Sequence, residues 1–211
     1  MARTRIGIIG AGNMGSAFAK RLAAAGHDVT ITAKDPAHAE QAAQQAAAAG
    51  GSVRAVPRDQ IARDADVLIV ATYFPDAPDA LRAAGDLTGK TVIDISNPLT
   101  PDMSGLSLGH TTSAAEELQK AVPNARVVKA FNTVFAQVLG GTGRAQVLYA
   151  GDDASAKDAV RALIESAGFE AVDAGPLANA RQLEPLGLLN IYFGYVAGRG
   201  TGIAPAFVAV A

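Results

Sequence analysis

Short, continuously apolar runs recur along this chain of 211 residues, separated by longer stretches in which apolar residues follow helical spacing. The first run covers residues 6–9 and stops at Gly10, after which helical spacing begins near Asn13. Continuous apolar runs are typical of strands that are buried on both faces of a parallel sheet. Strands that alternate with helices predict an α/β fold around a mostly parallel sheet.

The pattern predicts eight strands, at residues 6–9, 28–32, 53–56, 66–71, 90–95, 126–131, 146–150 and 169–173. It predicts helices over 13–26, 36–49, 112–120, 152–166 and 178–198, and a short one around Ile61. We expect a Rossmann-type doubly wound, mostly parallel sheet with helices on both faces and a small C-terminal α/β extension. Because no repeat or low-complexity linker interrupts the chain, we expect one compact unit over 1–211, with a dinucleotide-binding core over 1–125 and a C-terminal lobe over 126–211.

Composition and charge narrow the functional classes. Hydrophobic residues make up 49% of the chain and the formal net charge is −2, which gives no general attraction to nucleic acid or to an anionic membrane. The chain has no cysteine and only three scattered histidines, so we expect no disulfide, no thiolate nucleophile and no metal site.

The start of the chain superficially resembles a signal peptide, since Arg3 and Arg5 precede an apolar run. That run is short and leads directly into a glycine turn, so we interpret it as a strand. No apolar run is long enough to span a bilayer. We therefore expect a cytoplasmic protein.

The turn after the first strand contains the sequence Gly10, Ala11, Gly12, Asn13, Met14, Gly15. In a strand–turn–helix setting, Gly10 permits the tight turn, Gly12 lets a pyrophosphate approach the backbone, and Gly15 lets the helix pack closely on the strand. The phosphates would bind to the free N–H groups at the positive end of the helix dipole. The alternative is a glycine-rich loop that binds nothing, but the strand and helix around this turn favour dinucleotide binding.

The end of the second strand indicates which dinucleotide is bound. NAD enzymes place an acid there for the ribose 2′-hydroxyl, whereas NADP enzymes supply a cation for the 2′-phosphate. Here Thr32 and Ala33 are followed by Lys34, which favours NADP, although a solvated surface lysine is the alternative. Asp35 precedes Pro36 and is better explained as the N-cap of the next helix than as a ribose contact.

Two further loops follow predicted central strands, where ligands of open α/β sheets bind. The first begins with Thr72 and Tyr73, and its aromatic residues either stack near the adenine or ribose or plug the core. The second contains Asn97, whose amide either reaches the nicotinamide or its ribose or forms an Asx-turn before Pro98.

Several motifs together resemble the NADPH-dependent reductases of the deazaflavin coenzyme F420 and the related reductase domain of six-transmembrane metalloreductases. The matching segments are residues 10–15 (GAGNMG), 129–133 (KAFNT), 151–153 (GDD) and 173–181 (DAGPLANAR). The last two lie outside the dinucleotide motif and make the resemblance more specific than a general Rossmann pattern. Where the archaeal deazaflavin enzymes are expected to carry histidine, this chain has Asn132, as the metalloreductases do.

The resemblance implies roles for particular residues. Residues 11–14 would bind the pyrophosphate, and Ala33 with Lys34 would flank the 2′-phosphate. The backbone of Ala130 would hold the nicotinamide carboxamide, with Asn132 beside it at the cofactor. The region of Gly202 and Ile203 would help form the pocket of a second ring. The C-terminal lobe would then serve the acceptor and dimerisation, because members of the family tend to form homodimers.

The sequence offers no evident acid–base pair, and this favours hydride transfer between NADPH and a flavin-type ring over carbonyl reduction, which needs a placed proton donor. Only His110, Tyr192 and Tyr195 are candidate donors, and we expect the tyrosines to be packing residues. The alternatives are a noncatalytic NADP-binding or redox-sensing module and a small carbonyl or imine reductase. Such reductases use a large helical C-terminal domain, for which we expect this chain to be too short.

Overall fold

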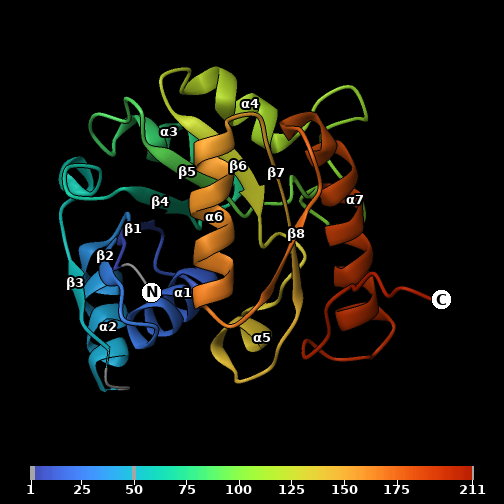
Figure 1. Ribbon diagram of the computed structural model, residues 1–211, viewed down its shortest axis with the longest axis horizontal. Helices are drawn as coiled ribbons and strands as arrows, with labels where there is room; N and C mark the ends of the chain where they lie inside the picture. Colours follow the sequence, from blue (N-terminus) through green and yellow to red (C-terminus); the bar gives the residue numbers. More distant parts are fainter. Residues whose placement is uncertain (1–2, 49–50, 211) are drawn as a thin grey trace.

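Eight strands form one twisted sheet in the computed structural model, which describes residues 3–48 and 51–210 (Figure 1). They are β1 (Arg5–Ile9), β2 (Asp28–Thr32), β3 (Val53–Ala55), β4 (Val67–Val70), β5 (Thr91–Asp94), β6 (Arg126–Ala130), β7 (Gln146–Gly151) and β8 (Glu170–Asp173). Their order is β3-β2-β1-β4-β5-β6-β7-β8. All pairs are parallel except β6 with β7. The predicted Rossmann-like, mostly parallel sheet is confirmed.

Helices connect these strands, in the order α1 (Asn13–Ala24), α2 (Pro36–Ala48), α3 (Ala77–Arg82), α4 (Ala114–Ala121), α5 (Ala136–Gly140), α6 (Ala154–Ser166) and α7 (Ala180–Ile191). Short 3₁₀ turns occur at Arg58–Gln60, Phe74–Asp76 and Leu177–Asn179, and a π-helical turn at Tyr192–Val196 continues α7. The helix predicted around Ile61 is the first of these turns. The predicted end of the second helix, at Ala49, lies outside the described residues.

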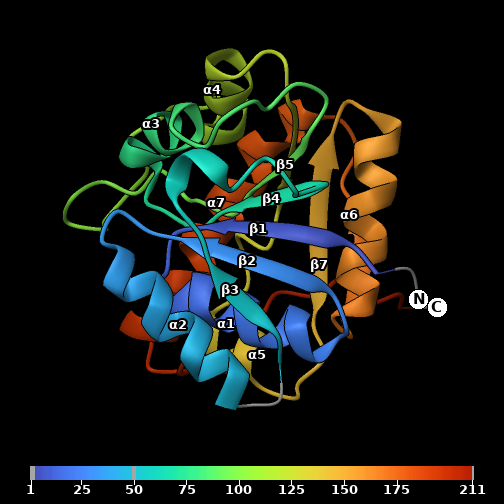
Figure 2. The same ribbon diagram turned by 90° about the vertical axis from the view of Figure 1, so that its left-hand side faces the viewer.

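Both faces of the sheet are covered. Figure 2 shows α1, α2 and α5 on one side of β1 and β2, and α3 and α4 on the other. The first side carries the larger apolar core, which includes Phe18 of α1 and Val160 of α6. The second side includes Leu81 of α3 and Leu118 of α4. Helix α7 packs on β7 through Leu183, so the C-terminal part of the chain is attached to the same sheet.

Several helix ends lie where their capping residues predict them. Ser113 Oγ accepts a hydrogen bond from the Glu116 N–H at 3.2 Å at the start of α4. Asp153 Oδ1 accepts one from the Ala156 N–H at 2.8 Å at the start of α6. Gly26, just after α1, has a φ of 89°, which is the left-handed conformation that glycine adopts at helix ends.

Within residues 3–48 and 51–210, no helix has the length and apolar character needed to cross a membrane. The division of the chain at residue 125 stays a prediction. Strands β5 and β6, which flank that position, pair directly from Thr91 with Arg126 to Asp94 with Lys129.

Candidate functional site

The three glycines of the first turn have different surroundings. Gly10 has a φ of 112°, and a Cβ there would lie 2.5 Å from the carbonyl oxygen of Ala71. A Cβ on Gly15 would lie 1.9 Å from the carbonyl oxygen of Gly10, so only glycine lets α1 begin this close to β1. A Cβ on Gly12 would meet nothing within 4 Å. The fold therefore requires Gly10 and Gly15, whereas the surface at Gly12 is open to a ligand.

Helix α1 begins at this open surface without a side-chain cap. Gly12 is its N-cap residue, and no side chain of the described residues caps it. The first N–H groups of a helix have no partner within the helix. Together with the helix dipole they form a binding site for an anion. Ala11, Asn13 and Met14 lie half-buried or exposed around these groups, as a pyrophosphate site requires.

The end of β2 lies directly beside the glycine turn. The Gly10 N–H donates to the carbonyl oxygen of Thr32 at 2.8 Å. Thr32, Ala33 and Lys34 line a pocket of about 360 Å³. Asp35 Oδ1 accepts a hydrogen bond from the N–H two residues further on at 3.0 Å, which confirms Asp35 as the N-cap residue just before α2.

The loop after β4 brings Thr72 and Tyr73 to the same edge of the sheet. Thr72 Oγ1 is buried and has no hydrogen-bond partner among the described residues. The Tyr73 side chain is 83% exposed, so Tyr73 does not plug the core. Stacking of the Tyr73 ring near the adenine or ribose stays a prediction.

Asn97 and Asn132 contact each other at the ends of β5 and β6. Asn97 Nδ2 donates to the Asn132 carbonyl oxygen at 2.8 Å, and Asn132 Nδ2 donates to Asn97 Oδ1 at 2.9 Å and to the Leu183 carbonyl oxygen at 2.7 Å. A Cβ on Gly187 of α7 would lie 2.5 Å from Asn97 Oδ1, so α7 passes very close to this pair. The Asx-turn considered for Asn97 occurs instead at Asp94, which accepts from the N–H two residues on at 2.9 Å.

The chain changes direction sharply after Ala130. Phe131 has a φ of 60°, which is strained for a bulky residue. Its buried ring is held edge-on by Phe18, with ring centres 5.0 Å apart, and by Phe169 at 6.1 Å. Strain of this kind persists only where packing enforces it, and it is frequent at functional sites. The turn places Asn132 beside the end of β5 instead of continuing the strand.

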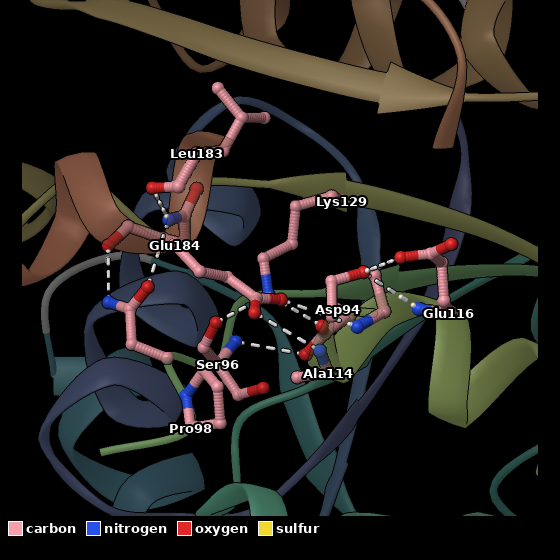
Figure 3. Close-up of polar contacts among 12 residues, drawn as sticks. Asp94, Ser96, Pro98, Ala114, Glu116, Lys129, Leu183 and Glu184 are labelled. Carbon is pink, nitrogen blue, oxygen red and sulfur yellow. Dashed lines mark hydrogen bonds and ion pairs between the residues drawn. The ribbon is translucent and has the colours of Figure 1, made fainter. Parts of the chain in front are cut away.

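A buried ion cluster lies next to this edge (Figure 3). The fully buried Lys129 Nζ lies 2.7 Å from Asp94 Oδ2, 2.8 Å from Glu184 Oε1 and 2.5 Å from the carbonyl oxygen of Ser96. The Glu184 carboxylate also accepts hydrogen bonds from two main-chain N–H groups at the start of α4. Burial raises the pKa of Glu184, and the Lys129 ammonium group opposes that rise. The Lys129 ammonium group thus donates to three acceptors and joins β5, β6 and α7. None of its three N–H groups is left for a ligand.

This cluster was not predicted from the sequence, although two signals were present. Lys129 lies in the middle of an apolar run, and Glu184 lies in the apolar tail helix. A charge placed among apolar residues calls for a partner of opposite sign, because burying it alone is costly.

Four buried polar atoms at this edge have no hydrogen-bond partner among the described residues. They are Thr72 Oγ1, Ser96 Oγ, Asn132 Oδ1 and Thr133 Oγ1. Native proteins leave few such atoms unpaired, so each calls for an explanation. All four follow the carboxyl ends of β4, β5 and β6, where an open α/β sheet binds its ligand. The hydroxyls and amide of this edge, together with the open backbone at Gly12, fit a nicotinamide dinucleotide.

The tail helix is buried on one side only. Leu183 is 4% exposed, whereas Leu189 is 48% exposed. Tyr192 and Tyr195 are 50% and 69% exposed, so they are not buried as predicted. The Tyr195 ring nevertheless packs edge-on against Phe135, with ring centres 5.6 Å apart. Gly202 lines a second pocket of about 280 Å³ between α5, the start of β7 and the tail. His110 is exposed in the loop before α4.

Comparisons with known proteins agree with this geometry. Residues 5–98 match the family model described as NADP oxidoreductase coenzyme F420-dependent. The chain is 32% identical over 191 residues to metalloreductase STEAP3 of Rattus norvegicus, covering 88% of this chain but only 37% of that protein. It is 29% identical over 192 residues to the F420-dependent NADP reductase of Methanothermobacter marburgensis, covering 84% of this chain and 86% of that one.

A solved structure extends the match over nearly the whole fold. It is that of a putative F420-dependent NADP reductase from Arthrobacter sp. FB24, with a TM-score of 0.83 and 30% sequence identity. The match covers 94% of this chain and 96% of that one. The fold, the glycine turn and this similarity lead to one assignment: the chain belongs to the F420-dependent NADP oxidoreductase family, a family of NADP-dependent oxidoreductases that is related to the reductase domain of the STEAP metalloreductases.

Proposed function

We propose that this protein transfers a hydride between NADPH and a planar, flavin-type acceptor, either the deazaflavin F420 or a flavin. The names of the related proteins support the deazaflavin, since two of them are F420-dependent NADP reductases or putative ones. The first relative, a metalloreductase, supports a broader choice of acceptor. NADPH supplies the hydride when bound, and the protein contributes orientation and exclusion of water.

In this proposal the pyrophosphate binds to the N–H groups at Gly12 and the start of α1. Lys34 contacts the 2′-phosphate at the end of β2. The nicotinamide lies along the edge formed by Thr72, Asn97 and Asn132, with its carboxamide on the backbone at Ala130. Tyr73 is free to pack against the adenosine side of the cofactor.

The observation that carries the proposal is the chemistry of the unpaired atoms at this edge. Three are hydroxyl oxygens and one is an amide oxygen. These groups hydrogen-bond a neutral ring and its ribose, but they are poor general acids at neutral pH. The nearby ammonium group of Lys129 is already held by three acceptors. An edge of this kind suits transfer between two stacked rings better than protonation of an alkoxide.

An acceptor panel tests the proposal. The purified protein is mixed anaerobically with NADPH and, separately, with F420, FMN, FAD, a ferric chelate, and a small ketone or imine, and NADPH oxidation is followed by absorbance. We expect turnover with at least one flavin-type acceptor and none with the ketone or imine. Turnover only with the ketone or imine would support the carbonyl or imine reductase. Tight NADPH binding without turnover on any acceptor would support a noncatalytic NADP-binding or redox-sensing module.

We also propose that the protein forms a homodimer. Leu189, Tyr192, Tyr195 and Val196 expose large apolar side chains along the outer side of α7 and the turn after it. A patch of this composition is typical of a contact between subunits. Light scattering coupled to size-exclusion chromatography should give twice the chain mass of 21.4 kDa. A monomer over the micromolar range would rule this out.

A further inference from the structure

The pocket of about 360 Å³ lies between the loops that follow β2 and β3. The residues that line it include the apolar Pro36 and Ala39 and the cationic Lys34 and Arg58. Lys34 follows β2, and Arg58 begins the 3₁₀ turn that follows β3. Two cations from two neighbouring loops therefore reach one pocket.

The sheet register explains why they meet. Ile31 of β2 pairs with Ala55 of β3, and the Val56 N–H donates to the Ile31 carbonyl oxygen at 3.0 Å. Lys34 and Arg58 are each three residues beyond this aligned pair. Because parallel strands end at the same edge of a sheet, their continuations emerge at the same level.

The positive charges of this pocket are only partly neutralised by the protein. Neither Lys34 nor Arg58 forms an ion pair with a carboxylate in the part of the chain that the structure describes. Glu40 is the single acidic residue among the lining residues, so two cations and one carboxylate leave one positive charge. The nearby Asp35 carboxylate is engaged with the start of α2. The net positive charge of the pocket therefore favours binding of an anion.

The position of the pocket beside the glycine turn indicates which anion it binds. The Gly10 N–H donates to the Thr32 carbonyl oxygen, and Thr32 is itself a lining residue. A dinucleotide whose pyrophosphate lies at Gly12 therefore brings its adenosine ribose to this pocket. A phosphate monoester carries a charge between about −1.5 and −2 at neutral pH, which one lysine does not balance. An arginine adds a planar fork that matches phosphate oxygens.

We propose that Arg58 and Lys34 together bind the 2′-phosphate of NADPH, and that Arg58 is a second determinant of the preference for NADPH over NADH. This inference rests on the proposed function, in which the pyrophosphate lies at Gly12. Arg58 would then add to the specificity for NADPH that Lys34 provides.

Equilibrium titrations of NADPH and NADH against the wild type, Arg58→Ala, Lys34→Ala and the double variant test the inference. We expect each single variant to bind NADPH at least about tenfold more weakly and to bind NADH within about twofold of the wild type. The double variant should lose most of the discrimination between the two dinucleotides. Arg54→Ala is the matched control, because Arg54 is exposed on β3 and does not line the pocket. It should change neither affinity.

Adenosine 2′,5′-bisphosphate and AMP separate this subsite from the rest of the cofactor site. The wild type should prefer the bisphosphate, and Arg58→Ala should weaken the bisphosphate but not AMP. Equal losses for NADPH and NADH, or a loss in Arg54→Ala as large as that in Arg58→Ala, would overturn the role of Arg58. If the wild type binds NADH and NADPH equally, the phosphate site is wrong while the dinucleotide site stands. If it binds neither, the proposed function fails as well.

Discussion

Gly12 and Gly15 lie in the same turn but have opposite surroundings, and this difference yields a prediction. An added Cβ at Gly15 would collide with the Gly10 carbonyl oxygen, whereas one at Gly12 would project into open space. We expect Gly15→Ala to lower the free energy of unfolding by about 1–3 kcal/mol, as overpacking does. Gly12→Ala should cost at most about 1 kcal/mol but weaken NADPH binding at least about tenfold, because the methyl group occupies the pyrophosphate surface.

Urea unfolding and NADPH titration measure these two effects separately. Gly12→Ala and Gly15→Ala add the same methyl group, so each serves as the control for the other. If Gly12→Ala left NADPH affinity unchanged, the pyrophosphate would not approach the backbone at this residue.

Replacing Lys129 should lower the free energy of unfolding substantially. Lys129→Met leaves Asp94 and Glu184 buried without their shared cation, and breaking a buried pair in this way typically costs about 3–5 kcal/mol. Lys120→Met is a suitable control, because Lys120 pairs with Glu117 at the surface and should cost less than about 1 kcal/mol. Both are measured by urea unfolding at pH 7. A loss below about 1 kcal/mol for Lys129→Met would contradict the ionised cluster.

At the scale of elements, α4 and α7 are joined by an ion pair between Glu116 and Arg181. Arg181 donates to both Glu116 carboxylate oxygens, at 2.6 and 2.8 Å. The hydrogen bond from Arg181 lowers the pKa of Glu116 below its ordinary value of 4.5. Because the folded pKa is depressed, this contribution to stability is complete above pH 4.5 and is lost as the pH falls through the folded pKa.

Glu116→Gln tests this pair. We expect the variant to lose about 1 kcal/mol at pH 7 and to approach the wild type as the pH falls from 4.5 through the folded pKa of Glu116. Free energies of unfolding measured from pH 7 to pH 3 give the difference curve. Glu165→Gln, a change in an exposed carboxylate on α6, provides the control. A difference that stays constant across this range would mean that Glu116 contributes through packing instead of charge.

The elements that could be predicted from the sequence are those whose signals are local. The strands were recognisable because parallel strands are continuous apolar runs, and α4 and α6 because Ser113 and Asp153 cap them. Helices α3 and α5 were missed because six and five residues are too short to establish helical periodicity. The glycine turn is equally local, so the roles of Gly10 and Gly15 in the fold could be read from it.

The rest of the candidate site depends on contacts between distant segments. Lys129 and Glu184 are 55 residues apart, and Asn97 and Asn132 are 35 apart. Nothing in either segment alone specifies its partner. Arg58 joins Lys34 only through the register of β2 with β3. Sequence patterns therefore located the edge of the sheet where the cofactor would bind, while the side chains that support that edge required the fold.

At the scale of the whole molecule, the continuous sheet predicts how the chain unfolds. Strand β6 pairs with β5 on one side and β7 on the other, and α7 is joined to β6 through the buried ion cluster. The predicted core over 1–125 is therefore joined to the lobe over 126–211 by the pairing of β5 with β6. We expect one cooperative thermal transition for the chain instead of two.

NADPH should shift that single transition as a whole. At about 100 times its dissociation constant, a ligand that binds only the folded state adds about 2.7 kcal/mol. For a domain of this size, that raises the melting temperature by about 5–11 °C. NADH at the same concentration should raise it less, and Gly12→Ala, with an affinity at least about tenfold weaker, should reduce the NADPH shift to about half or less. Differential scanning calorimetry measures all three. Two transitions, with NADPH moving only one, would mean that the division at residue 125 separates independent domains and that the nicotinamide edge is not shared between them.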